Sequence, residues 1–224
     1  MSSRAGDARA RRYFPGPTAW RTTVPSYTKA GLELHGFQIM QTWEAGLMGA
    51  MARDVTRRGG SVLEVGYGLG IAAREIRKHR PALHVIIEAN EHIAAVARHR
   101  YRREIGHGTV RVMNEFWKTA VVRIAKDKDS FDGILFDTFP QQASDLKRNH
   151  YAFFPIAQKL LSRGGKFTYF SDEVDSIGGE HQRRLWSAFG PRLTLELTRM
   201  RVRPPPSCEY WSARSILHVV VTKR

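Results

Sequence analysis

The segment Val62-Leu63-Glu64-Val65-Gly66-Tyr67-Gly68-Leu69-Gly70 decides the fold class of this 224-residue chain. Its apolar first half predicts a buried strand, and the G-x-G-x-G turn that follows leads into a helix predicted over Ile71–His79. Glycine is expected where the backbone turns sharply and approaches a ligand closely, because it has no Cβ. A tight turn with a purely structural role would give the same pattern, so this segment alone does not establish a binding site.

Outward from this segment, predicted strands and helices alternate along the chain. The strands are expected at Ser61–Val65, His84–Glu88, Val110–Met113, Phe131–Phe136 and Lys166–Phe170, and further helices at Glu91–Glu104 and His150–Leu161. The strand-like runs Leu193–Val202 and Ser215–Lys223 flank three prolines and indicate an antiparallel closing pair. The pattern predicts an α/β fold: a Rossmann-like, seven-stranded, mostly parallel sheet with helices on both faces and an antiparallel C-terminal strand pair.

The part of the chain before the first predicted strand divides into two regions. Residues 1–34 are rich in Arg, Pro, Thr and Ser and have no clear periodicity, which indicates an N-terminal arm. Residues 35–224 are predicted to form a single domain. Its first element is a predicted helix over Phe37–Arg57, because Phe37, Met40, Glu44, Leu47, Met48 and Met51 recur at helical spacing.

Charge is the unusual bulk property of the sequence. Lys and Arg number 36 against 21 Asp and Glu, a formal net charge of +15. Such an excess is compatible with nucleic-acid binding. However, the basic residues are spread along the chain, and the densest group, Arg98–Arg103, is interpreted as a solvated helix face. A nucleic-acid partner is therefore not expected.

The sequence lacks the signals of disulfide bonds, metal sites, membrane spans and secretion. The single cysteine, Cys208, cannot form an internal disulfide or a cysteine-based zinc site. The histidines show no metal-ligand spacing, so no metal is predicted. No apolar run approaches the roughly 20 residues needed to span a bilayer, and no secretory signal is recognised. A cytoplasmic protein that does not bind membranes, either a monomer or a homodimer, is expected.

A nucleotide-like cofactor is indicated by Glu88, at the end of the strand that follows the glycine turn. A carboxylate there, about 20 residues beyond the turn, can accept hydrogen bonds from both hydroxyls of a ribose. The third glycine, Gly70, comes one position too early for a dinucleotide site. Glu64 would oppose a pyrophosphate but could attract the α-amino group of a methionine. S-adenosyl-L-methionine therefore fits better than NAD.

Three segments together resemble the guanidinoacetate N-methyltransferase family: Leu63–Gly68, Ile86–Asn90 and Phe131–Pro140, with Trp43-Glu44, Trp20, Pro204–Tyr210 and Val219–Lys223 in agreement. The resemblance covers most of the chain from about Ala19. It implies that the N-terminal arm folds over the site as a lid. It also implies cofactor contacts from the arm, from the turn and from the next strand end, namely Trp20, Met40, Met48, Gly66, Tyr67, Gly68, Leu69, Gly70, Ile71, Ala72, Glu88, Ala89 and Asn90.

Methylation of a guanidino group needs carboxylates, because a guanidinium is protonated at neutral pH and is a poor nucleophile. Two carboxylates can grip its N–H fork, and one can accept the proton as the N–C bond forms. Asp137 follows the fourth predicted strand, and Glu44 interrupts an apolar helix face. Both are predicted to be catalytic and substrate-binding, as the resemblance also implies, with Trp20 beside them. A helix-capping role for Asp137 and a structural ion pair for Glu44 are the alternatives.

The sequence departs from the family pattern at two places that bear on ligand binding, one at the acceptor and one at the adenine of the cofactor. Asp172-Glu173 replaces a Leu-Thr pair that contacts the carboxylate of guanidinoacetate in the family, and these carboxylates would repel an acidic acceptor. We therefore expect Asp172 and Glu173 to bind a second cationic or polar group, as in arginine or a guanidino-bearing intermediate of antibiotic biosynthesis. Glu115-Phe116 replaces Gly-Leu near the adenine, and Glu115 could accept a hydrogen bond from its amino group.

The sequence thus predicts an S-adenosylmethionine-dependent N-methyltransferase that acts on the guanidino group of a small molecule. Two alternatives remain. One is a methyltransferase of a macromolecule, either RNA, which the net charge favours, or protein arginine. The other is a non-catalytic module that keeps the fold and binds a metabolite or a partner.

Overall fold

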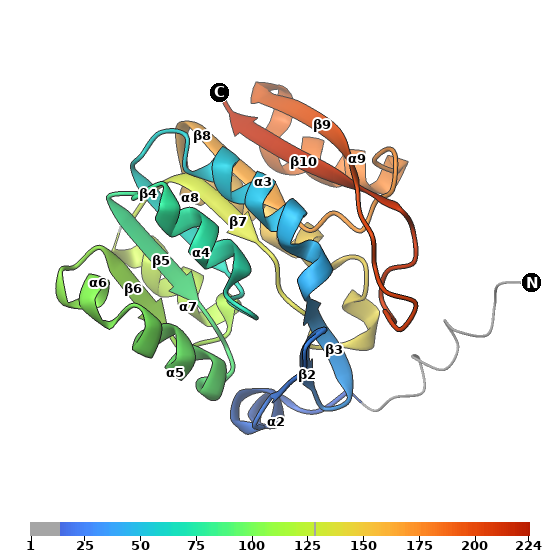
Figure 1. The fold of residues 1–224 in the computed structure, drawn as a ribbon. Helices are drawn as coiled ribbons and strands as arrows, with labels where there is room; N and C mark the ends of the chain where they lie inside the picture. The colour runs from blue at the N-terminus through green and yellow to red at the C-terminus, as the bar shows by residue number, and fades with distance from the viewer. Residues whose placement is uncertain (1–13, 128) are drawn as a thin grey trace, which may run out of the picture.

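The computed structural model describes residues 14–127 and 129–224 and is built around a seven-stranded sheet (Figure 1). Five strands run parallel: β4 (Ser61–Val65), β5 (Leu83–Ile87), β6 (Val110–Met113), β7 (Phe131–Phe136) and β8 (Leu161–Tyr169). The last two, β9 (Leu193–Arg201) and β10 (Ser215–Lys223), are antiparallel. The strand order is β6-β5-β4-β7-β8-β10-β9, which confirms the predicted sheet.

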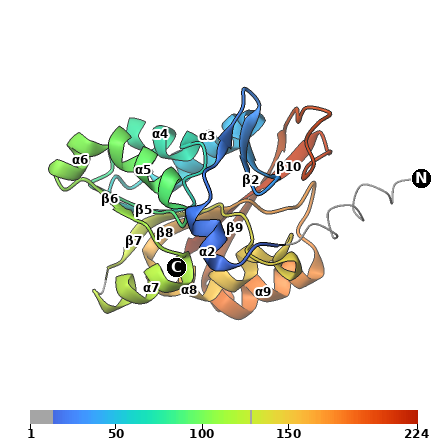
Figure 2. The same cartoon turned by 90° about the horizontal axis from the view of Figure 1, so that it is seen from below.

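Helices cover both faces of this sheet (Figure 2). One face carries α3 (Ala45–Val55), α4 (Ile71–Lys78) and α5 (Glu91–Arg100), with the short α6 (Arg102–Gly106) beyond them. The other carries α7 (Trp117–Lys126), α8 (Phe154–Leu160) and α9 (Gly179–Phe189). Because helices shield both sides, the central strands are apolar at nearly every position rather than alternating. The predicted α/β class is confirmed.

The order of the strands places a ligand site at β4. From β4 the chain adds β5 and β6 on one side, then returns to add β7 and β8 on the other. The loops that leave β4 and β7 therefore diverge and open a crevice at the carboxyl edge of the sheet. Open α/β sheets bind ligands at such a topological switch point.

A small antiparallel sheet precedes the large one and includes the first part of the helix predicted over Phe37–Arg57, so that prediction is wrong for Phe37–Gln41 and confirmed for Ala45–Val55. The sheet consists of β1 (Ser26–Tyr27), β2 (Gly31–Leu34) and β3 (Phe37–Gln41). His35 and Gly36 have φ angles of 53° and 73°, the conformation of a two-residue hairpin turn. Pairing with β2 fixes β3 as a strand. Only after the 3₁₀ turn Thr42–Glu44 does α3 begin, at Ala45.

The expected boundary between arm and domain falls inside this hairpin, since Leu34 and Phe37 pair with each other. The arm is not structureless where it is described: α2 (Pro17–Thr22) precedes the small sheet. The first 13 residues of the predicted arm lie outside the described residues.

Some element boundaries also differ from the sequence prediction. The helix expected over His150–Leu161 is a 3₁₀ segment, Asn149–Phe153, followed by α8, which has Pro155 near its start. The helix expected over Glu91–Glu104 is interrupted at Tyr101. Helices α7 and α9 were not predicted. Two more 3₁₀ turns lie at Ala143–Asp145 and Gly190–Arg192. Within the described residues, every helix is too short or too polar to span a bilayer.

Candidate active site

A cavity opens at the carboxyl edge of β4, β5 and β7. The empty space between its walls, including the open mouth, is about 1020 Å³, the size typical of small-molecule sites. Strand ends, the arm helix α2, β3 and the start of α7 contribute the walls. Of the predicted site residues, the walls include Trp20, Met40, Gly66, Tyr67, Gly68, Ala72, Glu88, Ala89, Asn90, Glu115, Phe116 and Asp137.

The glycine turn forms the floor of this cavity. Gly66 has a φ of 94°, and a Cβ on it would lie 1.9 Å from the carbonyl oxygen of Asp137. This close approach locks the end of β4 against the end of β7, and the amide of Asp137 donates to the carbonyl of Val65 over 2.9 Å. A Cβ on Gly68 would meet Met40 Sδ at 2.8 Å. Any larger residue at these two positions would displace the turn or the wall opposite.

Glu88 lies at the end of β5 and accepts hydrogen bonds from the turn. Its Oε2 accepts from the amide of Tyr67 at 3.0 Å, and its Oε1 accepts from the amide of Asn90 at 2.8 Å. Burial raises the pKa of this carboxyl, while these amides counteract the shift. Each carboxylate oxygen has further lone pairs. The position suits a ribose diol, as the sequence predicts.

Asn90 connects the cavity to the arm. Its side-chain oxygen accepts from the amides of His92 and Ile93 and so caps α5, and its amide group donates to the carbonyls of Trp20 and Thr23 at 2.9 and 2.8 Å. Trp20 is 6% exposed and packs against Phe14, Phe37 and Phe139. The arm helix therefore forms a wall of the cavity rather than a separate segment.

Two buried polar atoms of the wall residues have no hydrogen-bond partner within the described chain: Trp20 Nε1 and Glu115 Oε2. The other carboxylate oxygen of Glu115 pairs with Arg123. Buried polar atoms without partners are costly and suggest a polar ligand. Glu115 Oε2 offers a hydrogen-bond acceptor, and Glu88 offers a carboxylate for a ribose diol. Together with the aromatic walls, these groups fit S-adenosylmethionine. Trp20, Met40, Glu88 and Glu115 would hold it.

Glu44 lies at the end of the 3₁₀ turn before α3 and is not one of the residues that line the cavity. It is 2% exposed, and its Oε1 accepts a hydrogen bond of 2.7 Å from the amide of Gln41. Tyr210 donates to the same oxygen. Burial raises the pKa of Glu44, and the charge of Asp137 raises it further.

Asp137 follows β7, lines the cavity and is half-buried. Burial raises its pKa, as do the charges of Asp172 and Glu64. Within the described residues, neither Asp137 nor Glu44 has a Lys, Arg or His side chain within ion-pair distance. Two carboxylates held together without a cation favour the binding of a cationic ligand.

Asp172 and Glu173 make contacts with different parts of the structure. Asp172 has a φ of 57°, lies within electrostatic range of Asp137, and its Oδ2 is 3.9 Å from His150 Nδ1. Glu173 instead accepts from the amide of Gly178 and contacts His181 Nδ1 at 3.1 Å. Glu173 thus stabilises the start of α9 and lies outside the cavity walls, and its contact with the substrate stays a prediction.

Several other expected contacts are also absent from the cavity. Glu64 is fully buried and pairs with His84 Nε2 at 2.8 Å, below the turn, so it does not face an α-amino group. Met48 and Ile71 belong to the apolar core between α3 and α4. Leu69 and Gly70 lie outside the walls, although the amide of Leu69 contacts Met40 Sδ at 3.3 Å.

The structure adds site residues that the sequence interpretation missed. Phe139 packs against Trp20, with the ring centroids 5.5 Å apart, and completes the aromatic wall. Asn149 donates to the carbonyl and hydroxyl oxygens of Thr138, which fixes the loop after Asp137. Tyr210 reaches Glu44 from a loop 166 residues away. Local periodicity gives no signal for such distant contacts.

Solved structures share this fold. An O-methyltransferase from Bacillus cereus in complex with SAH superposes with a TM-score of 0.58 at 18% identity, covering 83% of this chain and 82% of that chain. The O-methyltransferase TomG from Streptomyces achromogenes, in complex with SAM, gives a TM-score of 0.57 at 15% identity and covers 82% and 81%. At these identities the likeness shows the class I methyltransferase fold.

Among curated proteins, the chain is similar to protein arginine N-methyltransferase 2 of two fungi. The Gibberella zeae protein is 27% identical over 148 residues, which cover 59% of this chain and 32% of the relative. The Aspergillus oryzae protein is 30% identical over 135 residues, covering 59% and 31%. The matched region thus spans about a third of the length of these relatives.

The family comparison covers nearly all of the described residues. The profile of guanidinoacetate N-methyltransferase matches residues 16–224, a range that includes the arm helix, the glycine turn, Glu44, Asp137 and the loop that carries Tyr210. The chain therefore belongs to the guanidinoacetate N-methyltransferase family of S-adenosylmethionine-dependent methyltransferases.

Proposed function

We propose that this protein methylates a guanidino nitrogen of a small, arginine-like acceptor. The observation that carries the proposal is the pair of carboxylates Glu44 and Asp137: Asp137 lines the cavity, Glu44 lies within electrostatic range of it, and neither has a cation of the described chain within ion-pair distance. A planar guanidinium can donate to both carboxylates in fixed geometry. Its positive charge would also relieve the repulsion that raises the pKa of both groups.

The chemistry divides between the cofactor and the chain. S-adenosylmethionine supplies an electrophilic methyl group when bound. Glu44 holds the guanidinium in place and Asp137 accepts a proton from the attacking nitrogen as its bond to the methyl carbon forms. A base whose pKa lies above the ordinary value for Asp is better matched to this proton transfer near neutral pH. Trp20, Phe139 and the arm helix exclude water from the reacting groups.

The choice of an arginine-like acceptor rests on Asp172. Its charge lies within electrostatic range of Asp137 and raises the pKa of that carboxyl. A free carboxylate on the acceptor, as in guanidinoacetate, would be repelled, whereas an amine would be attracted. Agmatine, which has an amine and no carboxylate, or arginine, whose carboxylate is accompanied by an α-amino group, therefore suits the site better than guanidinoacetate. A role in antibiotic biosynthesis stays a prediction from the sequence.

The second candidate is a protein arginine N-methyltransferase, favoured by the similarity to two fungal proteins of that name. Guanidinoacetate and protein arginine share the guanidino group, so Glu44 and Asp137 would serve either acceptor in the same way. What distinguishes them is whether a polypeptide can reach the cavity. Methylation of an arginine-containing peptide in preference to free arginine would favour this candidate.

The test is a methylation assay with S-adenosylmethionine and a panel of guanidinoacetate, arginine, agmatine and an arginine peptide, with the product detected by mass spectrometry. We expect a methyl gain on arginine or agmatine that falls at least 100-fold in both Glu44→Gln and Asp137→Asn, because each loses a charged partner of the guanidinium. Glu104→Gln, on the surface of α6, is the matched control and should keep wild-type activity. Equal or faster turnover of guanidinoacetate would overturn the acceptor assignment.

The same assay tests Asp172 directly. Asn tolerates positive φ, so Asp172→Asn keeps the backbone and removes only the charge. We expect the ratio of kcat/KM for arginine to kcat/KM for guanidinoacetate to fall in this variant. An unchanged ratio would mean that Asp172 does not select the acceptor.

A further inference from the structure

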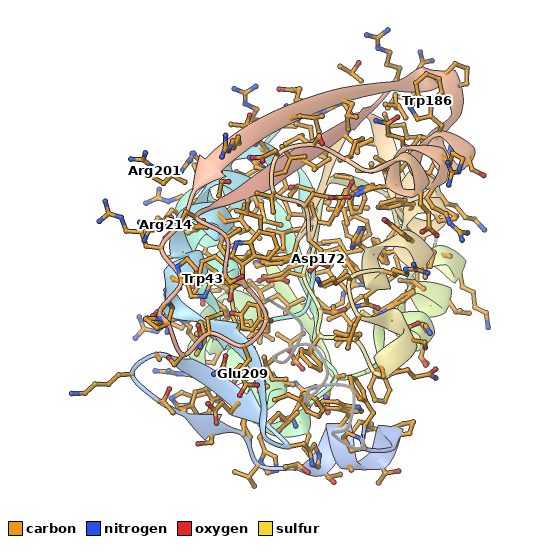
Figure 3. All side chains as sticks on the ribbon, turned by 90° about the vertical axis from the view of Figure 1, so that its right-hand side faces the viewer. Trp43, Asp172, Trp186, Arg201, Glu209 and Arg214 are labelled. Carbon is orange, nitrogen blue, oxygen red and sulfur yellow. The ribbon has the colours of Figure 1, made fainter. Side chains whose placement is uncertain are left out.

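The loop between β9 and β10, residues 202–214, leaves the end of the sheet and contacts the small N-terminal sheet. Gln38 on β3 binds this loop through both atoms of its side-chain amide. Its Nε2 donates to the carbonyl of Ser207 at 3.0 Å, and its Oε1 accepts from the amide of Glu209 at 2.9 Å. In Figure 3, Glu209 and Trp43 mark the region where the loop meets β3 and the start of α3. The reciprocal pair holds the loop in one position.

This docking brings Tyr210 to Glu44. The tyrosine hydroxyl donates to Glu44 Oε1, and the phenol ring lies 6.0 Å from the ring of Trp43. Trp43 is itself fixed, because its Nε1 donates to Gln41 Oε1 over 3.1 Å. The position of Tyr210 is thus determined by an aromatic contact and by the hydrogen bonds of Gln38.

The hydrogen bonds to Glu44 are unequal between its two oxygens. Oε1 accepts from both Tyr210 and the amide of Gln41. Within the described residues, no hydrogen bond to Oε2 is formed. Two donors on one oxygen prevent rotation of the carboxylate and leave the other oxygen for a ligand.

We propose that Tyr210, held in place by Gln38, is a positioning residue that directs Glu44 Oε2 toward the guanidinium of the acceptor. The inference rests on the proposed function of Glu44. It assigns the β9–β10 loop to the acceptor site, which is thereby assembled from segments at opposite ends of the chain. The hydrogen bond from Tyr210 also favours the ionised form of Glu44, which is the form that binds a cation.

Tyr210→Phe is the decisive variant, because it keeps the ring beside Trp43 and removes only the hydroxyl. We expect KM for the guanidino acceptor to rise about 10-fold or more, the scale of a lost hydrogen bond to a charged group. The acidic limb of the kcat/KM profile should move to higher pH, since Glu44 loses a donor that stabilises its charge. Kd for S-adenosylmethionine, measured by calorimetry, should stay at the wild-type value.

Two further variants separate positioning from general effects. Gln38→Met should change KM and the pH profile in the same direction as Tyr210→Phe, because it releases the loop. Tyr101→Phe is the matched control: it keeps the ring beside Tyr67 and removes a buried hydroxyl that has no hydrogen-bond partner in the described chain, so its loss should leave both quantities unchanged. Thermal unfolding of each variant verifies that it is folded.

The outcomes distinguish this inference from the proposed function. If the wild-type protein methylates no guanidino compound, the proposed function fails and the role of Tyr210 fails with it. If the wild type turns over the acceptor while Tyr210→Phe keeps its KM and pH profile, only the positioning role is overturned. A higher KM with an unmoved acidic limb would also overturn it, because a structural loss alone would give that result.

Discussion

At the residue scale, the site is defined by carboxylates that the fold keeps away from water. Glu44 is buried, Asp137 faces the cavity, and burial is the main reason that the pKa of each is raised. Such groups destabilise the protein in the absence of a ligand, because ionising them costs more in the folded state than in the unfolded one. Under the proposed function, this loss of stability accompanies a site that binds a cation.

This cost predicts a pH dependence of stability. Between the ordinary pKa of a carboxyl, near 4, and the raised value in the folded protein, the folded state keeps a proton that the unfolded state has lost. The free energy of unfolding therefore falls as pH rises through this window. Asp137→Asn should remove part of this fall and raise the free energy of unfolding by about 1–2 kcal/mol at pH 8, with little change at pH 4.

The measurement is thermal unfolding of the cofactor-free protein from pH 4 to pH 9. Glu104→Gln serves as the control, because this surface carboxylate should leave the pH dependence unchanged. A lower Tm for Asp137→Asn at pH 8 would show instead that the carboxylate stabilises the fold, through a cap or an ion pair.

At the element scale, the arm helix α2 is held to the domain through the start of α5. Asn90 donates to two carbonyls of the arm, and His92 Nε2 lies 3.1 Å from the carbonyl of Thr22. The backbone amide of Asn90 also donates to Oε1 of Glu88. One residue thus joins the arm helix, the cap of α5 and the carboxylate expected to bind ribose, so binding of the cofactor and docking of the arm are physically linked.

A pair of variants at position 90 separates the two tasks of Asn90. Serine keeps an acceptor for the α5 cap but is too short to donate to the arm, whereas alanine loses both. Asn90→Ser should weaken S-adenosylmethionine binding about 10-fold with stability near wild type. Asn90→Ala should weaken it similarly and lose about 1 kcal/mol more of the free energy of unfolding. Calorimetry and denaturant unfolding check both. Wild-type affinity in both variants would show that the arm does not contribute to binding.

At the scale of the whole molecule, part of the positive charge lies at the C-terminal ends of helices. Basic residues occupy the last turns of α3, α4, α5 and α6, where they favour the negative end of the helix dipole: Arg53, Arg77, Lys78, Arg98, Arg100 and Arg103. These helices run antiparallel to the strands, so their last turns lie toward the edge of the sheet opposite the cavity. Helix stabilisation therefore accounts for these six of the 36 Lys and Arg residues.

This distribution predicts that RNA is not the acceptor. Association with RNA should be non-specific, detectable at low salt, and lost by about 0.2 M salt, as expected for contacts with phosphates alone. Added RNA should not inhibit methylation of a small guanidino acceptor. Filter binding across a salt series and the methylation assay with RNA measure the two effects. Saturable RNA binding at physiological salt, or methyl transfer to RNA, would contradict the prediction.

The sequence by itself determined the sheet and the centre of the cofactor site. The strand at Val62–Val65, its glycine turn, Glu88 and Asp137 could be predicted because each signal lies within a few consecutive residues. Parallel strands then bring their carboxyl ends together, so local patterns in three separate segments converge on one edge of the sheet.

Only the tertiary structure decided which residues meet across long separations. Met40 reaches the cavity from a hairpin strand, since pairing with β2 overrides the helical spacing of Phe37, Met40 and Glu44. Glu64 pairs with His84 beneath the turn, and Tyr210 meets Glu44. The physical reason is common to all three. A periodic pattern records which face of an element is apolar, whereas the partner of a buried polar group is set by how distant elements pack.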